Sequence, residues 1–231
     1  MKRKSHRLLV LVLVLTTVIA LGACGSKNQS SSESSNTNGG SAESTGTSTE
    51  QPSKTWKEAP AMTIDQNKKY TAKVSTSKGD FTIELFAKDA PITVNNFVFL
   101  SKQGYYDGII FHRILESFMI QTGDPLGNGT GGPGYTIQDE LNGPHKYEEG
   151  IVAMAKTKAP NSAGSQFFIG TGPDIDNLNS MPDYPIFGKV IDGMDTVKLI
   201  AATPTEMDDS GREQSKPSEK VTINSIAITE E

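Results

Sequence analysis

Phe-His-Arg-Ile at residues 111–114 and Phe-Met-Ile-Gln at residues 118–121 are the stretches that decide the fold of this chain. Both are typical of short β-strands, in which neighbouring side chains point to opposite faces. Arg113 therefore faces away from His112. Polar side chains placed among large apolar ones in this way are unusual in a plain hydrophobic core.

A third stretch, Gly-Ser-Gln-Phe-Phe-Ile at residues 164–169, has the same character. By strand alternation Gln166 shares a face with Phe168, as Met119 does with Gln121. If these faces converge, they form an apolar slot edged by a guanidinium and two amides. None of the three stretches offers a side chain placed as a nucleophile.

The pattern of apolar and polar residues predicts a mainly β domain with two helices. The helices are expected over residues 91–103 and 194–202. Eight short strands with two separated helices favour a closed eight-stranded antiparallel β-barrel capped by the helices, and a β-sandwich is the alternative. The expected strands cover residues 70–77, 80–86, 109–114, 118–122, 151–155, 166–169, 186–191 and 221–228.

Four motifs in order along the chain resemble those of one family. They are Phe-His-Arg-Ile, Phe-Met-x-Gln-x-Gly-Asp, Asn-Gly-Thr-Gly-Gly and Gly-Ser-Gln-Phe-Phe-Ile, at residues 111–114, 118–124, 128–132 and 164–169. From about residue 70 to residue 228 the chain is similar to the cyclophilin-type peptidyl-prolyl cis-trans isomerases. The resemblance implies an eight-stranded antiparallel barrel capped by two helices, and an isomerase that needs no metal and no cofactor.

The resemblance also assigns the residues of a candidate site. Arg113 would be the catalytic arginine, and Gln121 would support it and contact the substrate backbone. Two positions depart from the family: Asn177 stands where many members have Trp, and Tyr184 stands where they have a groove histidine. The proline pocket would be formed by Phe118, Met119, Phe168 and Leu178. The groove for the rest of the substrate would be bordered by Gly129, Ala155, Lys156, Thr157, Gln166 and Tyr184.

Such a site suits the chemistry of an X-Pro peptide bond. Rotation of this bond meets a barrier of about 18–20 kcal/mol, because the amide must lose its resonance. An apolar slot that holds the proline ring, with Arg113 donating toward the prolyl nitrogen or carbonyl, favours the twisted amide over both planar forms. The departures at Asn177 and Tyr184 leave a second function open, a chaperone or adhesin module that binds proline-containing segments with little turnover.

The amino terminus predicts export and a lipid anchor. Cationic residues between Lys2 and Arg7 precede an apolar run over residues 8–21, which is shorter than the roughly 20 residues of a membrane span. Leu-Gly-Ala-Cys at residues 21–24 resembles the lipobox of bacterial lipoproteins, which implies lipidation of Cys24. The alternative is an ordinary secretory signal followed by an unpaired cysteine.

The residues after Cys24 predict a tether. Residues 25–50 are mostly Ser, Thr, Gly and Asn, with too little apolar surface to offset backbone ordering, so they are expected to be disordered. We therefore expect a signal peptide at residues 1–23, the lipidated cysteine and its tether at residues 24–55, and an isomerase domain at residues 56–231. The long polar tether favours attachment to the extracytoplasmic face of a Gram-positive cell membrane.

Composition sets the remaining expectations. The chain has 22 Lys and Arg against 27 Asp and Glu, and four of the cations lie in the export signal, so the rest of the chain carries a net charge of -9. This acidity argues against a nucleic-acid partner, and a single cysteine cannot form an internal disulfide framework. Only two histidines remain outside the signal, which is few for a zinc site. We expect a monomer that acts on proline-containing unfolded or exported polypeptides and meets the membrane through its lipid.

Overall fold

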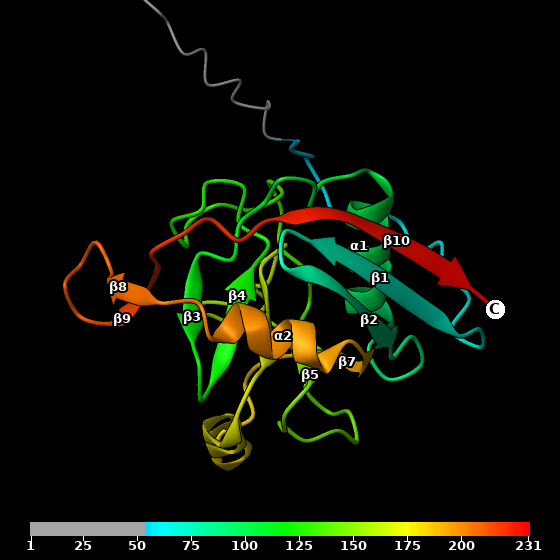
Figure 1. Ribbon diagram of the computed structural model, residues 1–231. Coiled ribbons are helices and arrows are strands. Elements are labelled where there is room, and N and C mark those ends of the chain that lie inside the picture. The colour runs from blue at the N-terminus through cyan, green and yellow to red at the C-terminus, as the bar shows by residue number, and fades with distance from the viewer. Residues whose placement is uncertain (1–53) are drawn as a thin grey trace, which may run out of the picture. The chain divides into compact units, whose positions relative to one another are not determined.

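A curled sheet of eight antiparallel strands organises residues 54–231, the part of the chain that this computed structural model describes (Figure 1). The mainly β class and the number of strands in this sheet are as predicted. In sheet order the strands are β10 (Ile223–Glu230), β1 (Tyr70–Thr76), β2 (Gly79–Leu85), β7 (Ile186–Asp192), β5 (Ile151–Met154), β6 (Phe167–Gly170), β4 (Met119–Thr122) and β3 (Arg113–Leu115).

The sheet does not close into the predicted barrel. Its two edge strands, β3 and β10, share no ladder, and the segments that precede them meet at one isolated bridge between Ile110 and Thr222. Strand β3 has three residues, too few to run along β10, and it contacts β9 (Gln214–Pro217) instead. The closed barrel was therefore the wrong prediction, and the sheet is a half-barrel.

Both predicted helices are present, α1 (Pro91–Lys102) and α2 (Met194–Ala201). Two further features were not predicted: a 3-10 helix, η1 (Pro173–Ser180), and a hairpin made by β8 (Thr205–Met207) and β9. Their sequences are polar and lack the regular apolar spacing on which the predictions depended. In Figure 1 the hairpin projects at the edge of the domain, beyond β3.

The sheet carries a hydrophobic core on each face. On the inner face, the ring of Phe97 from α1 lies 5.4 Å from that of Tyr106, 5.5 Å from that of Phe167 and 5.2 Å from that of Phe187. Burial on both faces explains why every residue of β5 and β6 is buried and why alternation is weak there. The outer core is smaller and consists of Met119, Tyr147, Ile151, Ala153, Phe168 and Ile175.

A loop residue caps the amino end of α1. Ala90 precedes the helix without a side-chain cap, and Pro91 occupies its first turn. The Glu140 carboxylate accepts hydrogen bonds from the backbone N–H groups of Ile92 at 3.0 Å and Thr93 at 2.8 Å. The carboxylate thus satisfies two otherwise free donors and interacts favourably with the helix dipole.

Removal of this cap is expected to destabilise the domain. We expect Glu140→Ala to lower the free energy of unfolding by about 1–2 kcal/mol, because two backbone donors lose their partner. Denaturant unfolding of the full chain measures the loss. The control is Glu148→Ala, which removes a surface carboxylate paired with Lys189, a kind of pair that contributes only about 0–1 kcal/mol. Equal losses in the two variants would contradict the capping role.

Residues 54–69 precede β1 and lie against the domain as an N-terminal strap. The Trp56 ring lies 5.2 Å from the Phe99 ring and 5.8 Å from the Tyr105 ring. The backbone N–H of Trp56 donates to the oxygen of Pro133 at 2.9 Å. The strap therefore supports the loop around Pro133, which borders the candidate site.

The predicted signal peptide, Cys24 and most of the tether lie outside the described residues. Within residues 54–231, no helix combines the length and the apolar character that crossing a bilayer requires.

Candidate functional site

The register of four neighbouring strands aligns predicted site residues in one row. Arg113 of β3 pairs with Gln121 of β4, Gln121 pairs with Phe168 of β6, and Phe168 pairs with Ala153 of β5. Directly paired residues of antiparallel strands project from the same face. The row therefore lies on the outer face of the half-barrel, together with the smaller core.

A cavity of about 160 Å³ opens at this row. Its walls combine the polar residues Arg113, Gln121 and Lys156 with apolar residues that belong to the outer core or pack against it. All of its lining residues are among those that the family resemblance assigned to the site. They are Arg113, Phe118, Met119, Gln121, Ala155, Lys156, Phe168, Leu178 and Tyr184.

A larger cavity of about 510 Å³ adjoins the first, because Gln121, Ala155 and Lys156 line both. The structure thus brings all the predicted pocket and groove residues around two adjoining cavities. Their individual roles in binding and catalysis stay predictions. The remaining assigned residues lie in the walls of the larger cavity: Gly129, Thr157 and Gln166.

A chain of hydrogen bonds connects Arg113 to the wall of the larger cavity. Arg113 Nη1 donates to Gln121 Oε1 at 3.5 Å, which is a long contact, and Gln121 Nε2 donates to Gln166 Oε1 at 2.9 Å. Gln166 Nε2 in turn donates to the backbone oxygens of Gly131 at 2.9 Å and Gly129 at 3.1 Å. The chain orients both amides, with the Gln121 oxygen toward Arg113, as a supporting role of Gln121 requires.

The main partner of Arg113 was not predicted from the sequence. Glu213, in the turn between β8 and β9, accepts hydrogen bonds from Arg113 Nε at 2.6 Å and from Nη2 at 2.8 Å. The hydrogen bond from Arg113 holds the pKa of the Glu213 carboxyl below its usual value. A single charged residue in a polar turn, 100 positions along the chain from its partner, gives no periodic signal that could have revealed the contact.

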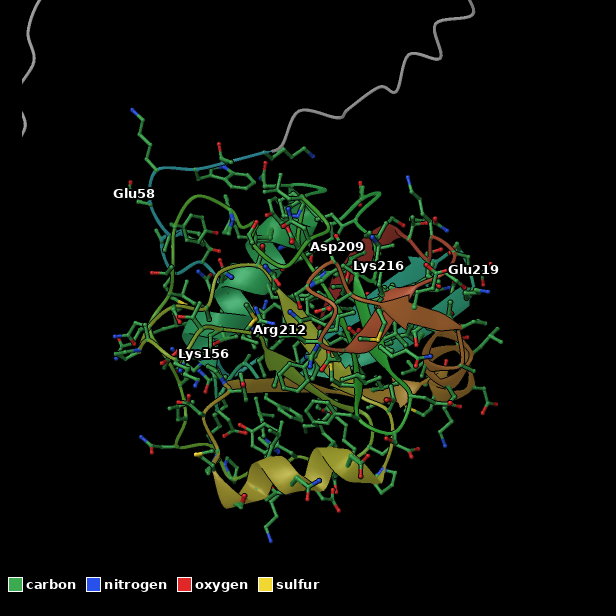
Figure 2. The ribbon with its side chains drawn as sticks, turned by 90° about the vertical axis from the view of Figure 1, so that its left-hand side faces the viewer. Glu58, Lys156, Asp209, Arg212, Lys216 and Glu219 are labelled. Atoms are coloured by element: carbon green, nitrogen blue, oxygen red, sulfur yellow. The ribbon has the colours of Figure 1, made fainter. Side chains whose placement is uncertain are left out.

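Lys156 is held between two carboxylates that were also not anticipated. Its side chain is 1% exposed, and its Nζ lies 3.1 Å from Asp183 Oδ1 and 3.2 Å from Asp139 Oδ2. Burial opposes the charge, but the hydrogen bonds to Asp183 and Asp139 outweigh it and raise the pKa of Lys156. Lys156, which is labelled in Figure 2, is thus a cavity-lining residue whose charge is already paired.

The two departures from the family pattern occupy different places. The Tyr184 ring meets the Phe168 ring edge-on at 5.5 Å and lines the smaller cavity. The Tyr147 hydroxyl fixes the Tyr184 backbone, because it accepts from its N–H at 2.9 Å and donates to its oxygen at 2.7 Å. Asn177 lies exposed on η1 and is not among the residues that line this cavity.

His112 lies beside Arg113 in sequence but is separate from the site. Neither ring nitrogen has a hydrogen-bond partner among the described residues, and burial lowers the pKa of His112. The part of the chain from residue 54 onward also holds no group of three His, Cys, Asp or Glu side chains arranged to bind a metal ion.

Acidification is expected to destabilise the domain through His112. The imidazole titrates near pH 6.5 when the chain is unfolded, and its pKa is lower in the folded state. Below about pH 6.5 the unfolded state therefore binds more protons, and stability falls as the pH falls. We expect His112→Phe, which removes the titrating group, to flatten this dependence in denaturant titrations at several pH values. If stability depends on pH equally in His112→Phe and in the wild type, His112 is not the group that causes the dependence.

Comparison with known proteins identifies the class of proteins to which this fold belongs. The family model described as cyclophilin type peptidyl-prolyl cis-trans isomerase/CLD matches residues 71–228, from β1 into β10. The chain belongs to this family of isomerases, and the prediction from its motifs is confirmed.

Curated relatives and solved structures agree with this assignment. Peptidyl-prolyl cis-trans isomerase CYP18-2 of Arabidopsis thaliana is 41% identical over 142 residues, which cover 59% of this chain and 83% of that protein. Peptidyl-prolyl cis-trans isomerase-like 1 of Aspergillus niger is 40% identical over 162 residues, which cover 68% of this chain and 93% of that protein. A cyclophilin type isomerase of Cryptosporidium parvum, crystallised in the presence of the dipeptide Ala-Pro, has 37% identity and a TM-score of 0.60, and the match covers 69% of this chain and 98% of that chain. These relatives are eukaryotic, so they do not test the predicted bacterial lipoprotein form.

Proposed function

We propose that this isomerase acts on X-Pro bonds of exported polypeptides, with Arg113 as the catalytic residue and Gln121 as its support. The observation that carries the proposal is the convergence of nine assigned residues around one cavity of about 160 Å³. The residues that precede the proline would lie in the larger cavity. The proline ring would be received by Phe118, Met119, Phe168 and Leu178.

Catalysis follows if the site binds the twisted amide better than either planar form. Burial of the proline ring contributes about 0.8 kcal/mol per CH₂ group and holds the ring while the chain on one side rotates. The prolyl nitrogen becomes a good hydrogen-bond acceptor only when amide resonance is lost, so a bond from Arg113 Nη1 selectively stabilises the transition state. Arginine suits this role because its charge is fixed and its donors are planar.

Exchange NMR on an Ala-Pro peptide tests activity and binding separately. We expect the full chain, purified in detergent, to accelerate exchange between the cis and trans proline signals when present in catalytic amounts. Saturable binding without acceleration would instead support the second candidate, a proline-segment chaperone or adhesin module, which the tyrosine at position 184 keeps open. Absence of both effects would contradict both candidates.

We further propose that the enzyme works as a monomer on the extracytoplasmic face of a Gram-positive cell membrane, attached through a lipid on Cys24. The lipobox-like residues 21–24, the cationic and apolar signal before them and the polar tether after them support this location. Two acyl chains are enough for stable anchoring, and a flexible tether of this length spans roughly 30 Å. Mass spectrometry of the mature amino terminus should find acylated Cys24. An unmodified peptide that contains Cys24 would contradict the anchor.

A further inference from the structure

Glu213 grips Arg113 along one edge of the guanidinium. Arg113 Nε donates to Oε2 at 2.6 Å and Nη2 donates to Oε1 at 2.8 Å, so the two planar groups form a bidentate pair. Each side chain is 34% exposed, so the pair lies at the solvent edge of the pocket. Two parallel bonds fix the plane of the guanidinium as well as its position.

The turn that carries Glu213 is itself held in place. The Asp208 carboxylate accepts hydrogen bonds from the Ser210 hydroxyl and from the Arg212 backbone N–H, both at 2.9 Å. The Asp208 N–H donates to the Glu213 backbone oxygen at 2.7 Å. Gly211 has a φ of +68°, which glycine adopts without strain. Since β9 also contacts β3, the hairpin is a preformed arm that carries its carboxylate to the site arginine.

The grip leaves one edge of the guanidinium for the substrate. A guanidinium has five N–H groups, and the bidentate pair uses one on Nε and one on Nη2. Nη1 faces Gln121 at 3.5 Å, a distance at which a hydrogen bond is weak. The Nη1 edge, on the side of the pocket-lining Gln121, therefore keeps donors that a prolyl amide can use.

We propose that Glu213 is a positioning residue for this isomerase, which holds Arg113 with its Nη1 edge toward the pocket and thereby raises turnover rather than substrate affinity. The inference rests on the catalytic role proposed above for Arg113. Without the contact to Glu213, the long Arg113 side chain would have to be ordered in each turnover before it could donate a hydrogen bond to the prolyl amide, and this ordering costs entropy. With the grip, that ordering is complete before substrate binds.

An inhibitory contact would have a different geometry. It would occupy the Nη1 edge and withhold its donors, whereas Glu213 occupies the Nε and Nη2 edge. The two alternatives also differ in sign, because removal of an inhibitory carboxylate raises kcat and removal of a positioning carboxylate lowers it.

Kinetics of the full chain with Glu213→Gln test the inference. Glutamine keeps the size but loses the charge and replaces one acceptor with a donor, so we expect kcat to fall about tenfold with KM unchanged. Glu213→Asp keeps the charge on a shorter side chain and should recover part of the loss. In an Arg113→Ala background, Glu213→Gln should lower kcat no further, because no guanidinium remains to be positioned.

Asp209→Asn is the matched control on the same hairpin. Asp209 pairs with Lys216 at 2.6 Å, and the two lie side by side in Figure 2. This variant removes a hairpin carboxylate that pairs with Lys216 and not with the guanidinium, so it should keep kcat. Unchanged or raised kcat in Glu213→Gln, or an equal fall in Asp209→Asn, overturns the inference.

A measurement without turnover separates this inference from the proposed function. The NMR signal of the Arg113 Nε–H group should be protected from solvent exchange in the wild-type chain and lose that protection in Glu213→Gln. A wild-type chain without isomerase activity would overturn the proposed function, while a protected Nε–H would still support the grip. An unprotected Nε–H in an active wild-type chain would overturn the inference alone.

Discussion

Arg113→Ala is expected to lower kcat/KM for proline isomerisation by about 100- to 1000-fold, the loss that follows removal of one preorganised donor at a reacting centre. The affinity for a proline peptide should change much less, because apolar walls such as Phe118 and Phe168 remain in the cavity. Exchange NMR measures turnover, and titration of the peptide measures affinity. The two numbers together separate transition-state stabilisation from ground-state binding.

Arg113→Lys is the control for charge alone. Lysine keeps the positive charge but presents a compact ammonium group rather than a planar fork, so it cannot pair bidentately with Glu213 and donate to the substrate at the same time. We expect it to recover only a small part of the activity. Full activity in either variant would remove Arg113 from the proposed mechanism.

Phe167→Ala is expected to cost about 3–5 kcal/mol of unfolding free energy, because it leaves a cavity in the inner core. The Phe167 side chain is fully buried, and its ring meets those of Phe97 and Tyr106 edge-on at 5.5 Å and 5.6 Å. Denaturant unfolding measures the loss. The fraction of this variant that stays folded should retain its affinity for a proline peptide, since Phe167 does not line the proline cavity.

Phe168→Ala, one residue further on, is expected to weaken peptide binding more than it lowers the free energy of unfolding. Phe168 faces the smaller cavity, so its truncation enlarges a space that is already open to solvent and should cost only about 1–3 kcal/mol. Its main effect should be weaker peptide binding. Equal stability losses in the two variants, or unchanged peptide affinity in Phe168→Ala, would contradict the assignment of the two faces.

The pocket could be predicted from short motifs because strand alternation is a local rule. It places Arg113 and His112 on opposite faces of their strand, and Phe168 and Phe167 on opposite faces of theirs, whatever the rest of the chain does. The two helices were predictable for the same reason, since their apolar spacing is continuous. In the structure the strand register brings the faces of Arg113, Gln121 and Phe168 together. Alternation does not predict what each residue does, and those roles came from the resemblance in four motifs.

The features that were missed depend on contacts between distant segments. Closure of the barrel is decided by whether β3 and β10 run alongside each other, and the three-residue length of β3 prevents it. The carboxylates that hold Arg113 and Lys156 come from loops without periodic patterns. A sequence shows that such loops are charged, but the partner of each charge is set by tertiary packing.

Both cations that line the two cavities have carboxylate partners, Arg113 with Glu213 and Lys156 with Asp139 and Asp183. The two cations face three carboxylates, so the groove has no excess of positive charge that would steer an acidic polypeptide toward it. Binding of the polypeptide then depends on short-range apolar contacts, which salt does not screen as it screens interactions between charges. Peptide capture by such a groove should depend little on ionic strength, which suits a protein proposed to work outside the cytoplasm.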